Sequence, residues 1–239
     1  MTTNNFQLLS RYSRQTMLPQ FGEESQRKLA SAKVLLVGVG GLGSPIALYL
    51  AGAGVGRIGL VDADVVSETN LQRQVLYKED EIGLPKVGCA KKRLLELNST
   101  IQVDCYACRF DRENSEKIAS QYDLIIDGCD NFSTRYLMDD VSFKLNIPYI
   151  YGSIGEFQGQ VSVFNWKNSC RYQDLYPKEN AVSVNEPIVK GVLGPVPGVI
   201  GTLQAIETVK VITGIGEPLR NRLLTINLLT MEMLILEIC

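Results

Sequence analysis

Apolar runs of four or five residues alternate with segments of helical period along the first two thirds of the chain. Five short runs predict buried strands, at residues 33–37, 57–61, 102–106, 123–127 and 149–152. Four segments between them carry apolar side chains at helical spacing, at residues 44–53, 86–97, 113–120 and 133–145. Strands and helices in this order predict a parallel sheet with helices on both faces.

The pattern changes after residue 152. Three further strands are predicted in meander order, at residues 160–165, 223–228 and 231–237, with a helix over 199–212 between the first two. Residues 166–190 follow neither period and are interpreted as a long crossover loop. We therefore expect an α/β fold, with a doubly wound Rossmann-like, mostly parallel sheet that C-terminal antiparallel strands extend.

Charge and composition exclude several classes of partner. The 239 residues are 45% hydrophobic, and the formal charge of −2 is scattered along the chain. No basic stripe is present, so no nucleic-acid partner is predicted. Residues 34–56 are uncharged and long enough to suggest a membrane span, but seven glycines and Pro45 interrupt them, so no membrane association is expected.

The cysteines and the first residues bear on the compartment. The six cysteines do not follow the spacing of a disulfide framework. Residues 1–15 lack the basic start, apolar run and small-residue cleavage site of a secretory signal. The expected location is therefore the cytoplasm.

A glycine motif follows the first predicted strand, in the stretch "VLLVGVGGLGSP". Gly38, Gly40 and Gly43 match the Gly-x-Gly-x-x-Gly pattern, in which missing side chains allow phosphates to approach a helix N-terminus. Asp62 lies nineteen residues after Gly43, at the end of the second strand, where a carboxylate can bind ribose hydroxyls. In the alternative interpretation the glycines permit tight helix packing and Asp62 caps a turn.

Two cations and a carboxylate are predicted at the same edge of the sheet. Arg73, in "ETNLQRQ", and Lys86, in "GLPK", together suit a triphosphate, although each alone would be typical of a solvated surface. Asp130, in "DGCDN", follows the fourth parallel strand, and a carboxylate beside phosphates indicates magnesium. The alternative role for Asp130 is the N-cap of the next helix, with Asn131 in the turn.

These motifs together resemble the ThiF/MoeB/HesA family, the bacterial relatives of ubiquitin-activating enzymes. The resemblance extends in order over about residues 11–237, through "RYSRQTMLPQFG", "VGVGGLGSP", "GLVDADVVSETNLQRQ", "GLPK", "DGCDN" and "GVLGPVPGVIGTLQAIETVK". It implies ATP-dependent adenylylation of the C-terminal glycine of a ubiquitin-like sulfur-carrier protein, with release of pyrophosphate. It also implies one domain over residues 1–239, with a nucleotide-binding half at 11–150 and an antiparallel extension at 151–239.

The resemblance assigns roles by matching position. It implies nucleotide contacts at Gly41, Asp62 and Asn131, phosphate contacts at Asn70, Arg73 and Lys86, and magnesium at Asp130. Arg14 matches the arginine that in this family reaches the triphosphate from the neighbouring subunit, which implies a homodimer with shared active sites. The otherwise preferred interpretation of Arg14 is an ordinary helix surface.

The chain contains no histidine, and the expected reaction does not require one. A terminal carboxylate, with a pKa near 3.5, is already ionised at neutral pH, so its attack on the α-phosphorus needs no general base. Arg14, Arg73, Lys86 and magnesium would neutralise the charge on the departing pyrophosphate.

The sequence also departs from the family pattern. Many relatives carry two Cys-x-x-Cys pairs that bind zinc, but here Cys170 is followed three residues later by Gln173, and Cys239 has no partner at that spacing, so zinc is not expected. Pro187 occupies the position of a loop cysteine, which puts a covalent cysteine step in doubt. Cys129, beside Asp130, is the remaining cysteine to test for reactivity.

Further possibilities stay open. An NAD-dependent dehydrogenase would explain the glycines but would leave Arg73, Lys86 and Asp130 unused. A non-catalytic partner subunit of the same fold is the other alternative. For the enzyme, a ThiS-like carrier of thiamine thiazole biosynthesis is the first expectation and a MoaD-like carrier of molybdopterin biosynthesis the second. The apolar stripe Val199, Leu203, Ile206 and Val209 is interpreted as core and dimer support.

Overall fold

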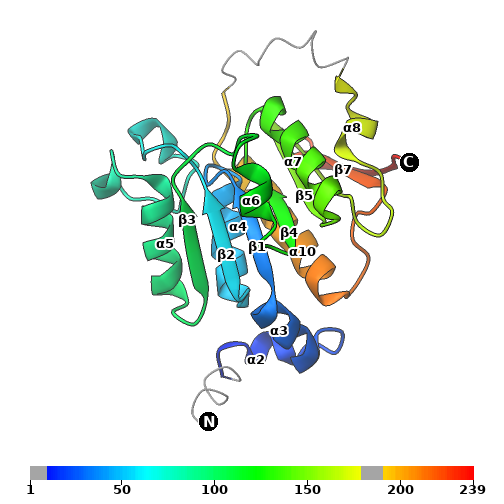
Figure 1. The fold of residues 1–239 in the computed structure, drawn as a ribbon, viewed down its shortest axis with the longest axis horizontal. Helices are drawn as coiled ribbons and strands as arrows, with labels where there is room; N and C mark the ends of the chain where they lie inside the picture. The colour runs from blue at the N-terminus through cyan, green and yellow to red at the C-terminus, as the bar shows by residue number, and fades with distance from the viewer. Residues whose placement is uncertain (1–9, 179–190) are drawn as a thin grey trace.

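The computed structural model describes residues 10–178 and 191–239, and in these residues eight strands form one sheet (Figure 1). The strand order is β3-β2-β1-β4-β5-β6-β7-β8. The strands are β1 Lys33–Val37, β2 Arg57–Val61, β3 Gln102–Tyr106, β4 Leu124–Asp127, β5 Tyr149–Gly155, β6 Gln158–Phe164, β7 Arg222–Asn227 and β8 Glu232–Glu237. The first five pair in parallel and the last three antiparallel, which confirms the expected fold class.

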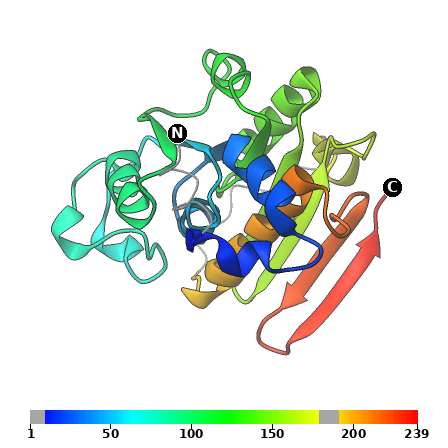
Figure 2. The same cartoon turned by 90° about the horizontal axis from the view of Figure 1, so that it is seen from below.

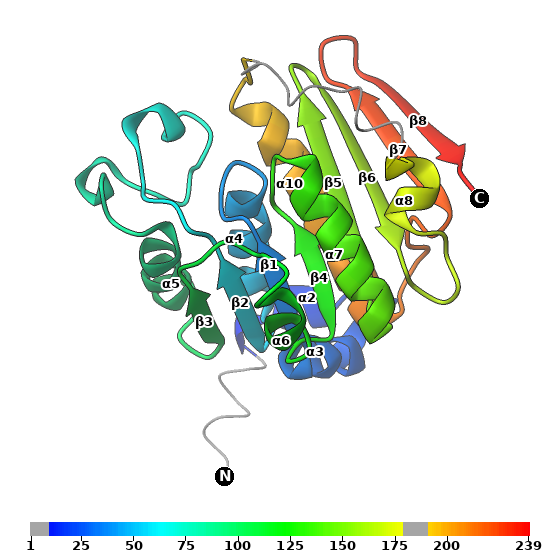
Figure 3. The ribbon, with the colours of Figure 1, turned by 45° about the horizontal axis from the view of Figure 1, so that its top comes forward.

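Helices cover both faces of the sheet (Figures 2 and 3). One face carries α4 Gly43–Ala53, α5 Lys86–Leu97 and α10 Pro195–Thr213, and α3 Gly22–Ser31 packs against α10 at one end of the sheet. The opposite face carries α6 Ser115–Ala119, α7 Phe132–Leu145 and the short α8 Tyr172–Leu175. The described chain also includes α2 Ser13–Thr16 and two 3-10 turns, η1 Glu68–Asn70 and η2 Glu79–Glu81.

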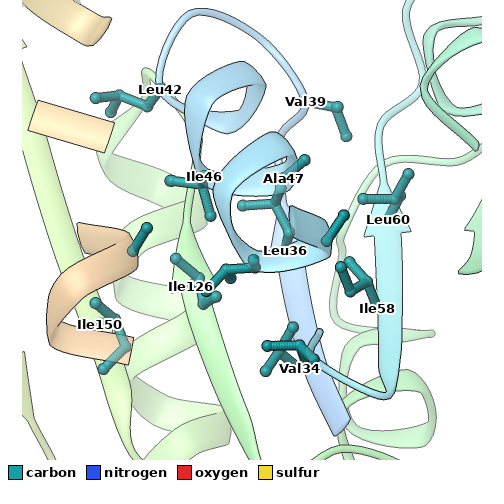
Figure 4. Packing of buried hydrophobic residues seen from close by; sticks show 14 of the residues in the cluster. Val34, Leu36, Val39, Leu42, Ile46, Ala47, Ile58, Leu60, Ile126 and Ile150 are labelled. Carbon is teal, nitrogen blue, oxygen red and sulfur yellow. The ribbon is translucent and has the colours of Figure 1, made fainter. Parts of the chain in front are cut away.

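The strand period places consecutive side chains of β1 in two separate cores. Val34 and Leu36 pack with the residues of α4 and α10, whereas Leu35 and Val37 pack with those of α6 and α7. Figure 4 shows the first of these cores, where Ile46 and Ala47 of α4 lie against the strands. All four β1 side chains are at most 3% exposed, as expected for a central parallel strand.

Most predicted elements agree with the structure to within one or two residues, and three segments differ more. The strand predicted at 149–152 continues to Gly155 as β5. The last helix begins four residues earlier than expected, at Pro195, because proline lacks only an N–H that the first helical turn leaves unpaired anyway. The predicted loop 166–190 contains α8 in its described part, and its residues 179–190, including Pro187, lie outside the described residues.

A disulfide contradicts the expectation drawn from the cysteine spacing. Cys170 and Cys239 are bonded, with their Cα atoms 6.2 Å apart. The hairpin of β7 and β8 returns the chain end to the start of the crossover loop, so two cysteines 69 positions apart become neighbours. No local spacing could indicate this pair.

The parallel strands define two edges of the sheet. The carboxyl edge is the end at which β1, β2 and β4 finish, and the segment between β2 and α5 extends from it (Figure 1). The amino edge is the opposite end, where α2 and α3 lie (Figure 1). Within the described ranges, no helix is sufficiently long and apolar to cross a membrane.

Candidate active site

The glycine loop joins β1 to α4 at the carboxyl edge, and its glycines serve two different purposes. Gly38 has φ +89, and a Cβ there would lie 2.5 Å from the Gly128 carbonyl oxygen. A Cβ at Gly43 would collide with the carbonyl of Gly38. The packing alternative is therefore correct for these two positions, because no side chain fits there.

Gly40 and Gly41 are not constrained in the same way. A Cβ at Gly40 would lie 3.4 Å from Gln74 Nε2, which is an ordinary contact distance. A Cβ at Gly41 would lie 3.2 Å from Pro197 Cβ and 3.7 Å from Arg73 Cδ. Packing of the described chain does not require a glycine at position 40, whereas close approach of a ligand would.

Asp62 holds the glycine loop in place. One of its carboxylate oxygens accepts a hydrogen bond from the Val39 backbone N–H at 2.8 Å, and the other accepts from the Asp64 N–H at 2.8 Å. Asp62 therefore does form the turn contact of the alternative interpretation. Each carboxylate oxygen can accept a second hydrogen bond, so the half-buried group can still bind a hydroxyl.

The segment after η1 lies against the glycine loop. Arg73 and Gln74 each donate a backbone N–H to the Asn70 carbonyl, at 3.0 and 2.9 Å. This turn brings Arg73 beside Gly41 and Gln74 beside Gly40. Arg73 Nη1 donates to the Thr69 carbonyl at 2.9 Å, which orients its guanidinium. The sequence interpretation found Arg73 but missed Gln74.

Lys86 begins α5 and is paired with an acid that the sequence interpretation overlooked. Its Nζ lies 3.0 Å from Asp64 Oδ2, and the two side chains are 5% and 71% exposed. The Lys86 backbone N–H also donates to the Asp64 carbonyl at 3.0 Å. An anion that binds Lys86 must therefore compete with Asp64 or share the ammonium group with it.

The loop after β4 presents Asp130 to solvent. Asp130 is exposed, and its carboxylate forms no hydrogen bond or ion pair with the residues that the structure describes. The N-cap of α7 is Asn131, whose Oδ1 accepts the Thr134 N–H at 2.9 Å. The alternative role of Asp130 as the helix cap is therefore wrong, and its carboxylate is available to a ligand.

A buried ion pair supports this loop from below. Arg135 Nε lies 3.0 Å from Asp127 Oδ2, and Tyr149 donates its hydroxyl to the same oxygen at 3.0 Å. Arg135 also donates to the Cys129 carbonyl at 3.0 Å, while Asp127 Oδ1 accepts the Cys129 N–H at 3.0 Å. Burial disfavours the guanidinium charge, but Asp127 together with Cys129, Tyr151 and Tyr149 outweighs that effect and raises the pKa of Arg135. The backbone of Cys129, which precedes Asp130, is thus fixed at both its N–H and its carbonyl.

Cys129 itself does not have the environment of a reactive thiol. Burial, together with the neighbouring Asp127, raises the pKa of Cys129 well above its usual range. Since the thiolate is the nucleophilic form, this cysteine is unreactive at neutral pH.

Arg14 is the one predicted site residue that lies elsewhere. It belongs to α2, at the amino edge, where the neighbouring Gln15 donates to the Ala53 carbonyl at the end of α4. Arg11 likewise donates to the Leu97 carbonyl at the end of α5. Both helices begin at the carboxyl edge, so each of these contacts is a full helix length away from the glycine loop.

The structure therefore brings the other predicted residues together at one edge, around a glycine loop that opens α4. Among residues 10–178 and 191–239, no group of three or more histidine, cysteine or acidic side chains could hold a metal ion. Asp130 could contribute a carboxylate to magnesium only together with ligand oxygens, which is how magnesium is usually bound beside phosphates.

This arrangement defines an α/β protein of the Rossmann type with a candidate ligand site at the carboxyl edge of its sheet. Residues 12–238 match the sequence profile described as the ThiF family. The chain belongs to that family, as the resemblance in its motifs predicted.

Relatives and solved structures agree with this assignment. The chain is 45% identical over 223 residues to a "sulfur carrier protein adenylyltransferase" of Thermus thermophilus, covering 90% of this chain and 82% of that one. It is 44% identical over 235 residues to a "probable molybdopterin-synthase adenylyltransferase" of Porphyra purpurea, covering 97% of this chain and 61% of that one. The chain thus spans less than two thirds of the Porphyra relative.

The fold is also that of a solved enzyme. The crystal structure of Escherichia coli MccB with ATP has a TM-score of 0.86 and 26% sequence identity, covering 99% of this chain and 77% of that chain. The match extends over the parallel strands and the antiparallel extension alike.

Proposed function

We propose that this protein transfers AMP from ATP to the C-terminal carboxylate of a ubiquitin-like sulfur-carrier protein. The observation that supports the proposal is that Arg73 borders the glycine loop at Gly41, while Lys86 and the unpaired Asp130 carboxylate follow other strands at the same carboxyl edge. The names of the Thermus and Porphyra relatives support the same reaction class. The MccB structure with ATP supports a nucleotide on this fold.

In the proposed reaction, an oxygen of the carrier carboxylate attacks the α-phosphorus of ATP. A new C–O–P bond forms, the bond from the α-phosphorus to the bridging oxygen of pyrophosphate breaks, and the products are an acyl adenylate and pyrophosphate. The attacking carboxylate is already an anion, so no proton has to move. Arg73 and Lys86 would offset the charge that builds on the leaving group.

The residues present fit ATP and magnesium. Packing does not require a glycine at position 40, so a ligand can approach the backbone there. Asp130 offers an exposed carboxylate two residues after Gly128, which packs against Gly38 of the glycine loop. Asp130 would help to hold magnesium, which when bound would supply positive charge to offset that of the phosphates. Asp62 would accept from ribose hydroxyls, and Asn70 and Asn131 would orient the nucleotide.

The test is exchange of labelled pyrophosphate into ATP, which requires reversible formation of the acyl adenylate. We expect exchange with an intact carrier, ThiS-like or MoaD-like, and none after its Gly-Gly tail is removed. Both carriers are needed because the names of the relatives include molybdopterin-synthase adenylyltransferases alongside the sulfur-carrier enzyme. Exchange that ignores the tail would refute the chemistry, and reduction of NAD in the same samples would favour the dehydrogenase alternative.

We further propose a homodimer in which Arg14 completes the site of the other subunit. Arg14 lies at the amino edge of its own sheet, so it can reach a triphosphate only in a second copy. The expected apolar stripe of α10 is only partly core, because Val199 is 37% and Ile206 53% exposed. Tyr49 of the neighbouring α4 is 59% exposed, and these side chains supply an apolar surface for a second subunit.

Mixing two inactive variants tests the shared site. In the proposed dimer, each site combines Asp130 of one subunit with Arg14 of the other. A mixed dimer of Arg14→Ala and Asp130→Ala subunits would therefore contain one intact site and one site that lacks both residues. We expect the mixture to recover roughly a quarter of wild-type exchange after subunits randomise in a two-fold dimer. No recovery, with mixed dimers verified by differential tagging, would show that both residues act within one chain.

A further inference from the structure

The carboxamide of Gln74 is buried beside the glycine loop without a complete set of hydrogen bonds. Gln74 is 4% exposed, and its Oε1 has no hydrogen-bond partner among the described residues. An unpaired buried polar atom costs about 1–3 kcal/mol, so such a group normally has an unrecorded partner. The partner of Oε1 must be a hydrogen-bond donor, because an amide oxygen only accepts.

The surroundings of Gln74 are rigid, so its position does not result from a loose loop. Its backbone N–H donates to the Asn70 carbonyl at 2.9 Å, and its own carbonyl accepts the Tyr77 N–H at 3.1 Å. The Tyr77 hydroxyl, which is buried, donates to the Val39 carbonyl at 2.7 Å. The segment that carries Gln74 is therefore tied directly to the glycine loop.

The carboxamide faces the space that Gly40 leaves open. Gln74 Nε2 lies 3.4 Å from the point where a Cβ of residue 40 would be. A ligand oxygen that occupies this point lies within about the reach of a hydrogen bond from Nε2. Arg73, the preceding residue, borders the missing Cβ of Gly41 in the same way.

We propose that Gln74 is a phosphate-binding residue of the nucleotide site, donating Nε2–H to a phosphate oxygen that lies over Gly40. This inference rests on the proposed function and adds to it a neutral donor beside the cationic Arg73. A carboxamide is neutral, so it can orient a phosphate oxygen by a hydrogen bond without adding positive charge to the site. The phosphate contact through Nε2 does not satisfy Oε1, whose partner would be a hydroxyl or a water of the bound ligand.

The test compares Gln74→Glu with Gln74→Met by calorimetric titration of a non-hydrolysable ATP analogue and of adenosine. Glutamate has the same shape but cannot donate and repels phosphate, so we expect the dissociation constant of the ATP analogue to rise on the order of a hundredfold. Methionine only removes the hydrogen bond, so we expect a rise of about tenfold. Adenosine affinity should not change in either variant, because adenosine carries no phosphate.

Gln121→Glu is the matched control, because it makes the same charge change at an exposed residue whose side chain contacts Arg57, away from the glycine loop. If the wild type binds the analogue and both Gln74 variants bind it equally well, the inference fails while the proposed function stands. If the wild type binds no analogue, the proposed function fails. If the Gln74→Glu variant does not fold, the affinity of the Gln74→Met variant is the test. If neither variant folds, Gln74 is a core residue and the inference is wrong.

Discussion

Neighbouring side chains satisfy Asp104 of β3, whereas two polar groups at the carboxyl edge, Asp130 and Gln74, lack partners in the described chain. Asp104, in the middle of β3, accepts hydrogen bonds from Arg57, the first residue of β2, at 2.6 Å, from Gln102 at 2.9 Å and from Tyr122 at 3.0 Å. At the carboxyl edge, Asp130 has no partner in the described chain, and the buried Gln74 lacks one for Oε1. A polar group that has no partner in the folded chain is a candidate for binding a ligand. The comparison therefore separates residues that stabilise the fold from residues that would bind the nucleotide.

The strongest test of this comparison exchanges one arginine at each edge. Arg73→Met should lower pyrophosphate exchange about a thousandfold, because a cation beside the transferred phosphate is lost. Arg57→Met should instead lower the melting temperature and leave the kinetic constants unchanged, because it breaks an ion pair near the amino edge. Similar kinetic losses in both variants would remove the distinction between the edges.

The disulfide gives a second test, which concerns the free energy of unfolding rather than ligand binding. Cys170→Ser should lower the free energy of unfolding under oxidising conditions, because the closed loop spans 69 positions. The chain-entropy argument sets the loss at up to about 4 kcal/mol. Urea unfolding measures it, and the affinity for the ATP analogue should stay the same. With reductant present, wild type and variant should unfold alike; a difference that persists would locate the effect in packing of Cys170 instead.

The buried pair Asp127–Arg135 should affect both stability and ligand binding, because it contacts the backbone next to Asp130. Arg135→Met should lower kcat and raise the magnesium concentration for half-maximal exchange by about 10- to 100-fold, as for other residues that orient a metal ligand. Its stability should fall too, since Asp127 is left buried without its partner. Adding Asp127→Asn should restore stability but not the magnesium dependence.

Tyr149→Phe is the milder comparison for that experiment, because it removes one hydrogen bond to Asp127 and keeps the arginine. A magnesium dependence that returns to normal together with stability in the double variant would mean that the pair acts only on folding.

The smallest expected effect concerns the pH dependence of stability at Asp104. Burial opposes ionisation of Asp104, but hydrogen bonds from Gln102, Arg57 and Tyr122 outweigh it and lower the pKa of Asp104 from its usual value. Asp104 therefore adds stability above its unfolded pKa, and that contribution is lost as the pH falls through the folded pKa. Between pH 7 and roughly pH 3, wild type should lose more stability in urea titrations than Asp104→Asn. Parallel curves would contradict the assignment.

Local features of the sequence predicted much of the fold. The strands 33–37, 57–61 and 102–106 and the helix 86–97 begin and end in the structure where the pattern placed them. The reason is that burial repeats every two residues in a strand and every three or four in a helix, so the signal lies within a window of about ten residues. The same reasoning predicted that the glycine loop, Arg73, Lys86 and Asp130 meet at one edge.

Other features of the site depended on partners that no short window contains. Lys86 pairs with Asp64, 22 positions away, and the sequence interpretation treated that lysine as a free cation. Asp130 was a candidate helix cap until the backbone around Asn131 showed which side chain reaches the Thr134 N–H. Gln74 had no motif of its own, because a buried amide without a partner is recognisable only when its neighbours are known.

The sequence by itself determined the order of strands and helices and the residue types available at the carboxyl edge, because periodicity and turn chemistry are local. The tertiary structure alone decided which polar groups neutralise one another. It joined Cys170 to Cys239 and placed Arg14 at the amino edge, away from the glycine loop. Such pairings depend on distances between elements, which chain packing sets and sequence spacing does not encode.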